Sequence, residues 1–194
     1  MIIAISGPSA SGKGTLARML AEHLSLPHYD FGLMFRAIAF LSPHFNFDHL
    51  LKFAEYGWMR VENWGGIWFK YNKGPVSLFR ELKTEEVALR AANIARENLS
   101  AITAISKAMV RHKDFVCDGR TCGSEIYPDA DYKFYITANE AERFGRRLGD
   151  NLTERKRREE LDKYRLVIPE GAIVVDTTCK TEEESLRELL SFLK

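Results

Sequence analysis

Residues 7–15, GPSASGKGT, combine the residue types and the spacing that a phosphate-binding loop requires. Gly7 and Gly12 frame a G-x-x-x-x-G pattern followed by Lys13, between a short apolar stretch and a helical pattern. Glycines let successive backbone N–H groups turn inward onto phosphate oxygens, and a helix N-terminus adds partial positive charge. Lys13 would reach the outer phosphates, whereas an ordinary tight turn needs no such lysine. The sequence therefore predicts a loop that holds the phosphates of a nucleotide.

The end of this loop narrows the class of protein. Serine or threonine usually follows the lysine directly and holds magnesium, but here Gly14 intervenes before Thr15. The GKGT variant is typical of small kinases that act on nucleotides, and less typical of GTPases or motor ATPases. The predicted nucleotide-binding residues of the loop are Gly7, Ser9, Ala10, Ser11, Gly12, Lys13, Gly14 and Thr15.

Length and composition agree with one compact enzyme. The 194 residues suit a single globular body with appended lobes, and the net charge of +1 argues against nucleic acid or membrane as a partner. No apolar run approaches the roughly 20 residues that span a bilayer, and MIIAIS lacks the features of a signal peptide. Cys117, Cys122 and Cys179 form no C-x-x-C pair, so we expect reduced thiols and a cytoplasmic location. We also expect a monomer. The histidines show no metal-ligand spacing.

Apolar runs alternate with helical patterns, which predicts an α/β fold with a parallel sheet flanked by helices. We expect strands at Ile2–Ser6, Phe115–Asp118, Tyr132–Thr137 and Ala172–Asp176. A helix follows the loop and ends before Pro27, and a longer helical stretch over 84–110 breaks near ENLS. The last helix, from Glu182 to about Phe192, carries a capping box at Thr181 and Glu184.

Two segments interrupt this alternation. Residues 41–97 hold the three tryptophans and include GGIWFKYNKGPVSLF, which predicts a β-hairpin with NKGP at its turn. Residues 148–169, LGDNLTERKRREELDKYRLVIP, are highly charged. They could form a solvated helix with Glu/Lys pairs, or a lid whose arginines close over phosphates. We divide the chain, as a single domain, into a core (1–40, 98–147 and 170–194), a lobe at about 41–97 and a candidate lid at about 148–169.

A family resemblance runs along nearly the whole chain. IAISGPSASGKGT, DFGLMFRAIA, ELKTEEV, DFVCDGR, YPDADYKFYITANEAER and DKYRLVIP…VVDTT follow one another with the order and spacing of bacterial cytidylate kinases. DGR followed by YPDA is quite specific to that family. The resemblance implies a P-loop nucleoside monophosphate kinase fold, in which a core carries an acceptor-binding lobe and a lid. It also implies ATP as the phosphoryl donor, Mg²⁺, and CMP or dCMP as the small-molecule acceptor.

Carried over position by position, the resemblance assigns the phosphate-handling residues. Arg36 and Arg120 match the arginines that hold the acceptor phosphate, and Asp118 ends a strand where a carboxylate can orient magnesium together with Thr15. The lid positions Arg158, Asp162 and Arg165 fall on the Arg, Asp and Arg of the family lid. Arg143 and Arg147 match helix positions that face the donor nucleotide. Several cations around a transferring phosphoryl group are what this chemistry needs.

The positions that read the base depart from the family. Phe31 replaces a serine, Ala92 and Ala101 replace a serine and an arginine that contact the pyrimidine, and Thr121 replaces an aspartate. A site that reads a base through hydrogen bonds loses discrimination when these partners vanish. Asn93, Asn98 or Lys107 could hold CMP through a shifted alignment, or the pocket could be remodelled for another monophosphate.

Two further alternatives follow from the altered pocket. In a remodelled pocket, Phe31 and the aromatic residues of the 41–71 region could stack on the base, or they could simply fill a small lobe. The chain could also be a regulatory protein that binds a nucleotide without turnover. Retention of the phosphate-handling residues argues against that non-enzymatic alternative.

Overall fold

The computed structural model describes residues 1–61, 66–71, 74–78, 80–146, 160 and 166–193. The chain forms two compact units, which we call the sheet unit (1–28 and 113–194) and the inserted unit (29–112). The inserted unit is wider than the expected lobe, because the helices on either side of residues 41–97 pack with it.

The sheet unit is built on a five-stranded sheet in the order β2-β6-β1-β7-β8. Strand β1 pairs in parallel with β6 and β7, and β7 pairs in parallel with β8. Strands β1, β6, β7 and β8 have the predicted bounds, except that β8 begins one residue later, whereas the short strand β2 was not predicted. The elements are β1 (Ile2–Ser6), α1 (Lys13–His23), β2 (His28–Asp30, which leads into the inserted unit), β6 (Phe115–Asp118), η2 (Cys122–Ile126), β7 (Tyr132–Thr137), α6 (Glu140–Gly145), β8 (Ile173–Asp176) and α8 (Glu182–Ser191).

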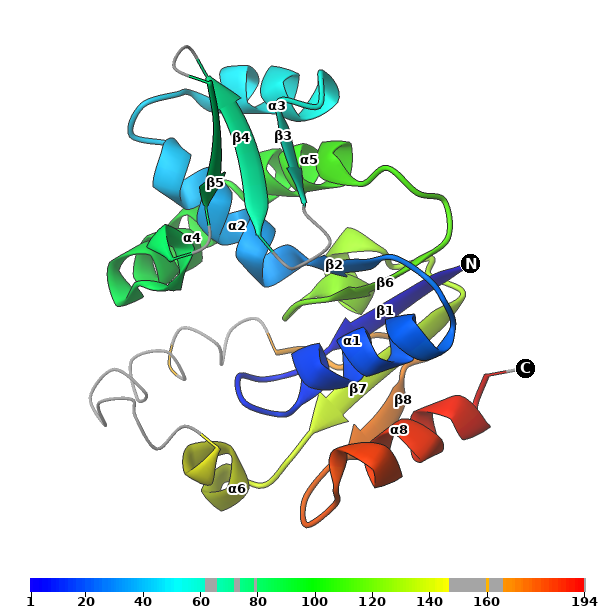
Figure 1. Ribbon diagram of the computed structural model, residues 1–194. Coiled ribbons are helices and arrows are strands. Elements are labelled where there is room, and N and C mark those ends of the chain that lie inside the picture. The colour runs from blue at the N-terminus through cyan, green and yellow to red at the C-terminus, as the bar shows by residue number, and fades with distance from the viewer. Residues whose placement is uncertain (62–65, 72–73, 79, 147–159, 161–165, 194) are drawn as a thin grey trace. The chain divides into compact units, whose positions relative to one another are not determined.

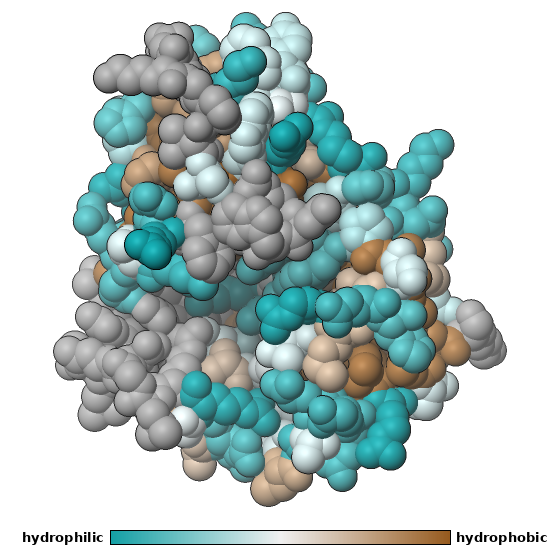
Figure 2. Space-filling view, viewed as in Figure 1, coloured by the Kyte–Doolittle hydropathy of each residue, from teal (hydrophilic) through white to brown (hydrophobic). Residues whose placement is uncertain are grey.

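Helices α1 and α8 cover the same face of this sheet (Figure 1). Alternate strand residues such as Ile3, Ile5 and Phe134 point to that face and are fully buried against Leu16 and Leu20 of α1. Apolar runs buried in this way are typical of central parallel strands. Figure 2 shows hydrophobic side chains at the surface between α1 and α8, where leucines at the edge of the core are only partly buried.

Helix α8 begins with the capping box that the sequence predicts. The Thr181 side chain accepts a hydrogen bond from the Glu184 N–H, and the Glu184 carboxylate accepts one from the Thr181 N–H. These bonds satisfy backbone donors that the first helical turn leaves open, and they lower the pKa of Glu184.

In its described residues, the inserted unit combines four α-helices with a three-stranded antiparallel sheet in the order β3-β4-β5. Helix α2 packs on α4 and α5, and α3 packs on α5. The predicted hairpin is confirmed as β4 and β5, although Gly74 and Pro75 of its predicted turn belong to β5, and residues 72–73 lie outside the described residues. The predicted break near ENLS separates α4 from α5. The elements are α2 (Phe31–Leu41), α3 (Phe47–Glu55), β3 (Met59–Val61), β4 (Ile67–Tyr71), β5 (Gly74–Leu78), η1 (Glu81–Lys83), α4 (Glu85–Glu97) and α5 (Leu99–Met109).

Aromatic side chains of the inserted unit pack on one another. Phe53 lies edge-on to Phe45 and Phe69 with ring centroids 5.3 and 5.6 Å apart, and it stacks on Trp58 at 5.8 Å. Phe31, at the start of α2, is 1% exposed. Edge-to-face rings in mutual contact are typical of a hydrophobic core. This packing favours the filled lobe over rings that are free to stack on a base.

Among the described residues, no helix is long and apolar enough to cross a membrane. The three cysteines are free thiols, with Cys117 and Cys122 buried and Cys179 exposed.

Candidate active site

The predicted phosphate-binding loop links the end of β1 to the start of α1. Its backbone reverses through residues with positive φ: Gly7 at 149°, Ala10 at 61° and Gly12 at 89°. A Cβ on Gly7 would lie 2.1 Å from the Ile136 carbonyl oxygen of β7, so the loop can approach this strand only with glycine at that position. Open α/β sheets bind ligands at the carboxyl ends of their strands, which is where this loop lies.

The N-terminus of α1 is free of the groups that usually occupy such an end. Gly12 is its N-cap residue and provides no side-chain cap, and the first turn carries no acidic residue. The helix begins at Lys13, whose Nζ donates a hydrogen bond to the Pro8 carbonyl at 3.2 Å. The lysine thus folds back across the loop. Backbone N–H groups at an uncapped N-terminus suit an anionic ligand.

Ser11 adds a buried hydroxyl to this loop. The residue is fully buried, and no described residue forms a hydrogen bond with its Oγ. The hydroxyl lies close beneath Gly7, since a Cβ on that glycine would be 3.2 Å from it. A buried hydroxyl without a partner costs about 1–3 kcal/mol. The observation fits a loop that is completed by a ligand outside the protein chain.

Asp118 lies next to the first turn of α1. The register of the sheet pairs it with Ile5, at the end of β6, and the residue is 4% exposed. One carboxylate oxygen, Oδ2, would be 3.5 Å from a Cβ on Gly14. The other, Oδ1, lies 2.8 Å from His28 Nε2. The histidine therefore holds one oxygen, while the second faces the turn that contains Thr15.

The predicted magnesium ligands are Thr15, in the first turn of α1, and Asp118, which lies beside that turn. Among the described residues, no three His, Cys, Asp or Glu side chains cluster as a metal site. A Mg²⁺ ion that arrives with a nucleotide needs only one or two protein ligands, because phosphates and water complete its shell. The Asp118 carboxylate beside the helix turn of Thr15 fits that requirement.

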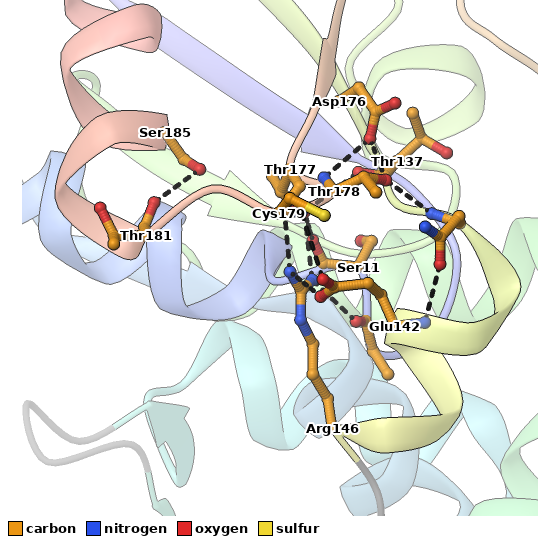
Figure 3. A network of polar contacts seen from close by, with 12 residues as sticks. Ser11, Thr137, Glu142, Arg146, Asp176, Thr177, Thr178, Cys179, Thr181 and Ser185 are labelled. Carbon is orange, nitrogen blue, oxygen red and sulfur yellow. Dashed lines mark hydrogen bonds and ion pairs between the residues drawn. The ribbon is translucent and has the colours of Figure 1, made fainter.

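Two arginines of the α6 segment reach the phosphate-binding loop. Arg143 Nη1 donates to the Ser9 carbonyl at 3.4 Å, which places this predicted donor-side residue at the loop. Its charge also acts on Tyr135, where burial raises the pKa of the hydroxyl and Arg143 partly offsets that rise. Arg146, which the sequence analysis did not single out, bonds to Ala10 and to Thr177 (Figure 3).

The acceptor-side predictions fall in both units. Arg36 is half-buried on α2, and its Nη1 donates to the Leu82 carbonyl at 3.4 Å. Ala92 on α4 and Ala101 on α5 are half-buried in the same inserted unit as Phe31. In the sheet unit, Arg120 follows β6, and Thr121 is 4% exposed at the start of η2. Arg147, Arg158, Asp162 and Arg165 lie outside the described residues.

The residues that sequence analysis missed share a cause. His28, Arg146 and Thr177 bond to residues 90, 136 and 166 positions away, namely Asp118, Ala10 and Ser11. No local periodicity reports contacts at such separations. The one available signal is that Arg146 lies directly beside the predicted Arg147.

A pH-dependent stability contribution arises at the loop that follows β8. Asp176 Oδ1 accepts hydrogen bonds from the Thr178 hydroxyl and N–H at 2.6 and 2.9 Å, which lower the pKa of its carboxyl below 3.8. A lowered carboxyl pKa stabilises the fold above the unfolded pKa, and the effect is lost as pH falls through the folded pKa. We expect Asp176→Asn to lower the melting temperature by a few degrees at pH 7.

The difference in melting temperature between wild type and Asp176→Asn should vanish as pH falls below 3.8. Thermal unfolding from pH 7 to pH 2.5 measures it. Asp129→Asn removes the same charge from an exposed position and serves as the control. A gap for Asp176→Asn that stays constant over this range would show that its carboxylate does not carry the effect.

Comparison with known proteins matches the chain over its full length. The model of the cytidylate kinase family matches residues 3–194. A cytidylate kinase from Aquifex aeolicus (strain VF5) is 32% identical over 216 residues, covering 100% of this chain and 96% of that protein. One from Clostridioides difficile (strain 630) is 31% identical, covering 98% and 97%. The crystal structure of TT1252 from Thermus thermophilus aligns with a TM-score of 0.52 at 15% identity, covering 100% and 98%, and supports the fold alone.

A mostly parallel sheet flanked by helices, with a phosphate-binding loop after its first strand, defines an α/β protein of the P-loop nucleoside monophosphate kinase fold. The full-length match then specifies the family. This chain belongs to the cytidylate kinase family of phosphotransferases.

Proposed function

We propose that this protein transfers the γ-phosphoryl group of ATP to CMP or dCMP and releases the nucleoside diphosphate. One observation carries the proposal. The loop between β1 and α1 has the backbone of an anion cradle, with Lys13 folded across it, in a chain whose relatives along the full length are named cytidylate kinase. Phosphoryl transfer depends on positioning and charge neutralisation, which such a cradle supplies.

The sheet unit would hold the donor. In this proposal, residues 7–15 bind the ATP phosphates through backbone N–H groups. The Lys13 ammonium stabilises the negative charge of the phosphoryl group during its transfer. Thr15 and Asp118 would hold Mg²⁺, and His28 would fix the orientation of the Asp118 carboxylate. The bound ion supplies neutralisation of the phosphate charge. Arg143 and Arg147 would face the donor nucleotide.

The acceptor phosphate would be held by Arg36 and Arg120, which are presented by α2 and by the turn after β6. Arginine suits this role because its planar fork makes paired, charge-assisted bonds to phosphate oxygens. Arg158, Asp162 and Arg165 would complete the charge clamp from the lid. Closure of such a lid excludes water from the reacting phosphates.

A second candidate function concerns the base of the acceptor nucleotide. The altered positions Phe31, Ala92, Ala101 and Thr121 present no charged group, and Phe31 and Thr121 are almost fully buried. Without charged partners, recognition of the base would depend on shape. A kinase of the same fold that acts on another monophosphate is therefore the alternative acceptor assignment. Binding of a nucleotide without turnover is the non-enzymatic alternative.

We further propose that the enzyme acts as a monomer in the cytoplasm. The three free cysteines suit a reducing compartment.

Coupled ADP release tests the function and predicts weak base selectivity. With ATP, Mg²⁺ and each of CMP, dCMP, UMP, AMP and GMP, we expect the highest kcat/KM for CMP or dCMP. Discrimination against the other bases should be about 10- to 200-fold, as for pockets that use shape rather than paired hydrogen bonds. Most of the acceptor affinity would come from its phosphate.

Three outcomes separate the candidates. A preference for another monophosphate would assign that acceptor. ATP binding without ADP release across the panel would support the non-enzymatic alternative. A preference for CMP above about 10⁴-fold would show that residues other than the four altered positions read the base through hydrogen bonds.

A further inference from the structure

Arg146 bonds to protein acceptors around the phosphate-binding loop. Its Nη1 donates to the Thr177 hydroxyl at 3.1 Å and to the Ala10 carbonyl at 3.4 Å, and its Nη2 donates to the Thr177 carbonyl at 3.0 Å. Figure 3 shows the guanidinium between the loop that contains Ser11 and the turn that follows β8. The side chain is 30% exposed. These bonds leave little of the guanidinium for a ligand.

Glu142 orients this guanidinium from one turn earlier in the chain. Its carboxylate lies 3.1 Å from Arg146 Nη2, and its Oε1 accepts the Cys179 N–H at 3.2 Å. The Asn139 side chain caps α6 by accepting the Glu142 N–H at 2.8 Å. The position of the arginine is thus fixed by both α6 and the turn after β8.

Thr177 holds the next carbonyl of the loop. The residue is 3% exposed, and its hydroxyl lies 3.0 Å from the Ser11 carbonyl and 3.1 Å from the Thr137 carbonyl. The Thr177 N–H already donates to the Thr137 carbonyl at 2.9 Å. The single hydroxyl proton is shared between these two carbonyl oxygens, of which that of Ser11 is the nearer.

Holding these carbonyls orients the loop. In a planar trans peptide, the C=O of one residue and the N–H of the next point in opposite directions. With the Ser11 carbonyl directed at Thr177, the Gly12 N–H points to the other side, at the N-terminus of α1. The bond to the Ala10 carbonyl holds a residue whose backbone φ of 61° is rare for any residue other than glycine.

We propose that Arg146 and Thr177 are positioning residues, which hold the Ala10 and Ser11 carbonyls so that the phosphate-binding loop keeps its anion-binding geometry. The inference rests on the proposed function in one respect, since it takes the ligand of the loop to be a polyphosphate. It assigns Arg146 a role through the backbone of the loop, rather than direct neutralisation of phosphate charge. Small displacements of such a cradle are costly, because binding and transfer both depend on its geometry.

The experiment compares a charged and an uncharged member of the pair. We expect Arg146→Ala and Thr177→Val each to lower ATP affinity, measured by calorimetry, and kcat/KM by about 10- to 100-fold. The double variant should lose little more than the worse single variant, because the two residues serve one structure. Thr177→Ser, which keeps the hydroxyl, should stay within about 2-fold of wild type. Arg187→Ala, an exposed arginine of α8 that bonds to its own helix, is the matched control and should match wild type.

Binding of inorganic tripolyphosphate tests the loop alone, because this ligand has the phosphates of ATP without the nucleoside. Its affinity should fall by the same factor as that of ATP in Arg146→Ala and Thr177→Val. Circular dichroism and thermal unfolding check that each variant is folded at the assay temperature. If Thr177→Val is unfolded there, Thr177→Ala and Arg146→Lys replace the two variants.

Three results would overturn the inference. In the first, Thr177→Val binds ATP normally while Arg146→Ala binds it weakly. In the second, the losses of the two single variants add in the double variant. In the third, the variants lose affinity for ATP but keep their affinity for tripolyphosphate. The first would show that the arginine acts by its charge. Failure of the wild type to phosphorylate any monophosphate would overturn the proposed function alone, because both binding measurements still test the loop. Failure of the wild type to bind ATP and tripolyphosphate would overturn both.

Discussion

Lys13→Met should abolish phosphoryl transfer and leave the fold intact. The Lys13 side chain is half-buried, and its Nζ donates a hydrogen bond to the Pro8 carbonyl within the same loop, so its loss changes the core little. In the transition state, an ammonium placed on the outer phosphates stabilises developing charge, and removing one such group costs about 10²- to 10³-fold or more in rate. We expect ADP release to fall below detection with a circular dichroism spectrum like that of wild type.

Lys113→Met is the matched control, because it removes an exposed lysine of the same sheet unit. It should keep activity within about 2-fold of wild type. Activity of Lys13→Met within a few-fold of wild type, with normal circular dichroism, would show that residues 7–15 are not the catalytic phosphate site.

Gly7→Ala should both unfold the protein more easily and remove nucleotide binding. The new Cβ would meet the Ile136 carbonyl oxygen at 2.1 Å, and the φ of 149° is one that side chains rarely adopt. Overpacking and backbone strain each cost about 1–3 kcal/mol, so we expect a loss of roughly 2–6 kcal/mol in the free energy of unfolding. Urea unfolding measures the loss, and calorimetry with ATP measures binding.

Two glycines provide the comparison. Gly145→Ala meets no atom within 4 Å in helix α6 and should be neutral or stabilise the protein by up to about 1 kcal/mol. Gly12→Ala has φ at 89° but its nearest neighbour is the Arg146 guanidinium at 3.7 Å, so strain alone should cost about 1–2 kcal/mol. If Gly7→Ala cost no more than Gly12→Ala, the close approach to β7 would not be what requires glycine.

Local signals in the sequence were enough to locate four strands and two helices of the sheet unit, although not the short strand β2. Three strands match their predicted bounds, and the fourth differs by one residue, because buried parallel strands are continuous apolar runs. The capping box of α8 and the break between α4 and α5 are also confirmed. These features depend on residues within a few positions of one another, which is what a sequence pattern records.

The family, too, follows from the sequence, since its motifs recur in order along the chain and the family model matches residues 3–194. The roles of the individual residues stay predictions. The same holds for the domain boundaries, for the lid residues Arg158, Asp162 and Arg165, and for the acceptor base.

Tertiary structure alone decided which side chains support the phosphate-binding loop. His28 meets Asp118 across 90 residues because β2 lies beside β6 in the sheet. Arg146 reaches Ala10 across 136 residues because the carboxyl ends of β1, β7 and β8 lie at one edge of the sheet. The burial of Phe31, and the mutual packing of Phe45, Phe53 and Phe69, were likewise open from composition. The sequence does not distinguish an aromatic residue of a hydrophobic core from one that lines a binding pocket. Only the neighbours that the fold brings to that residue distinguish the two.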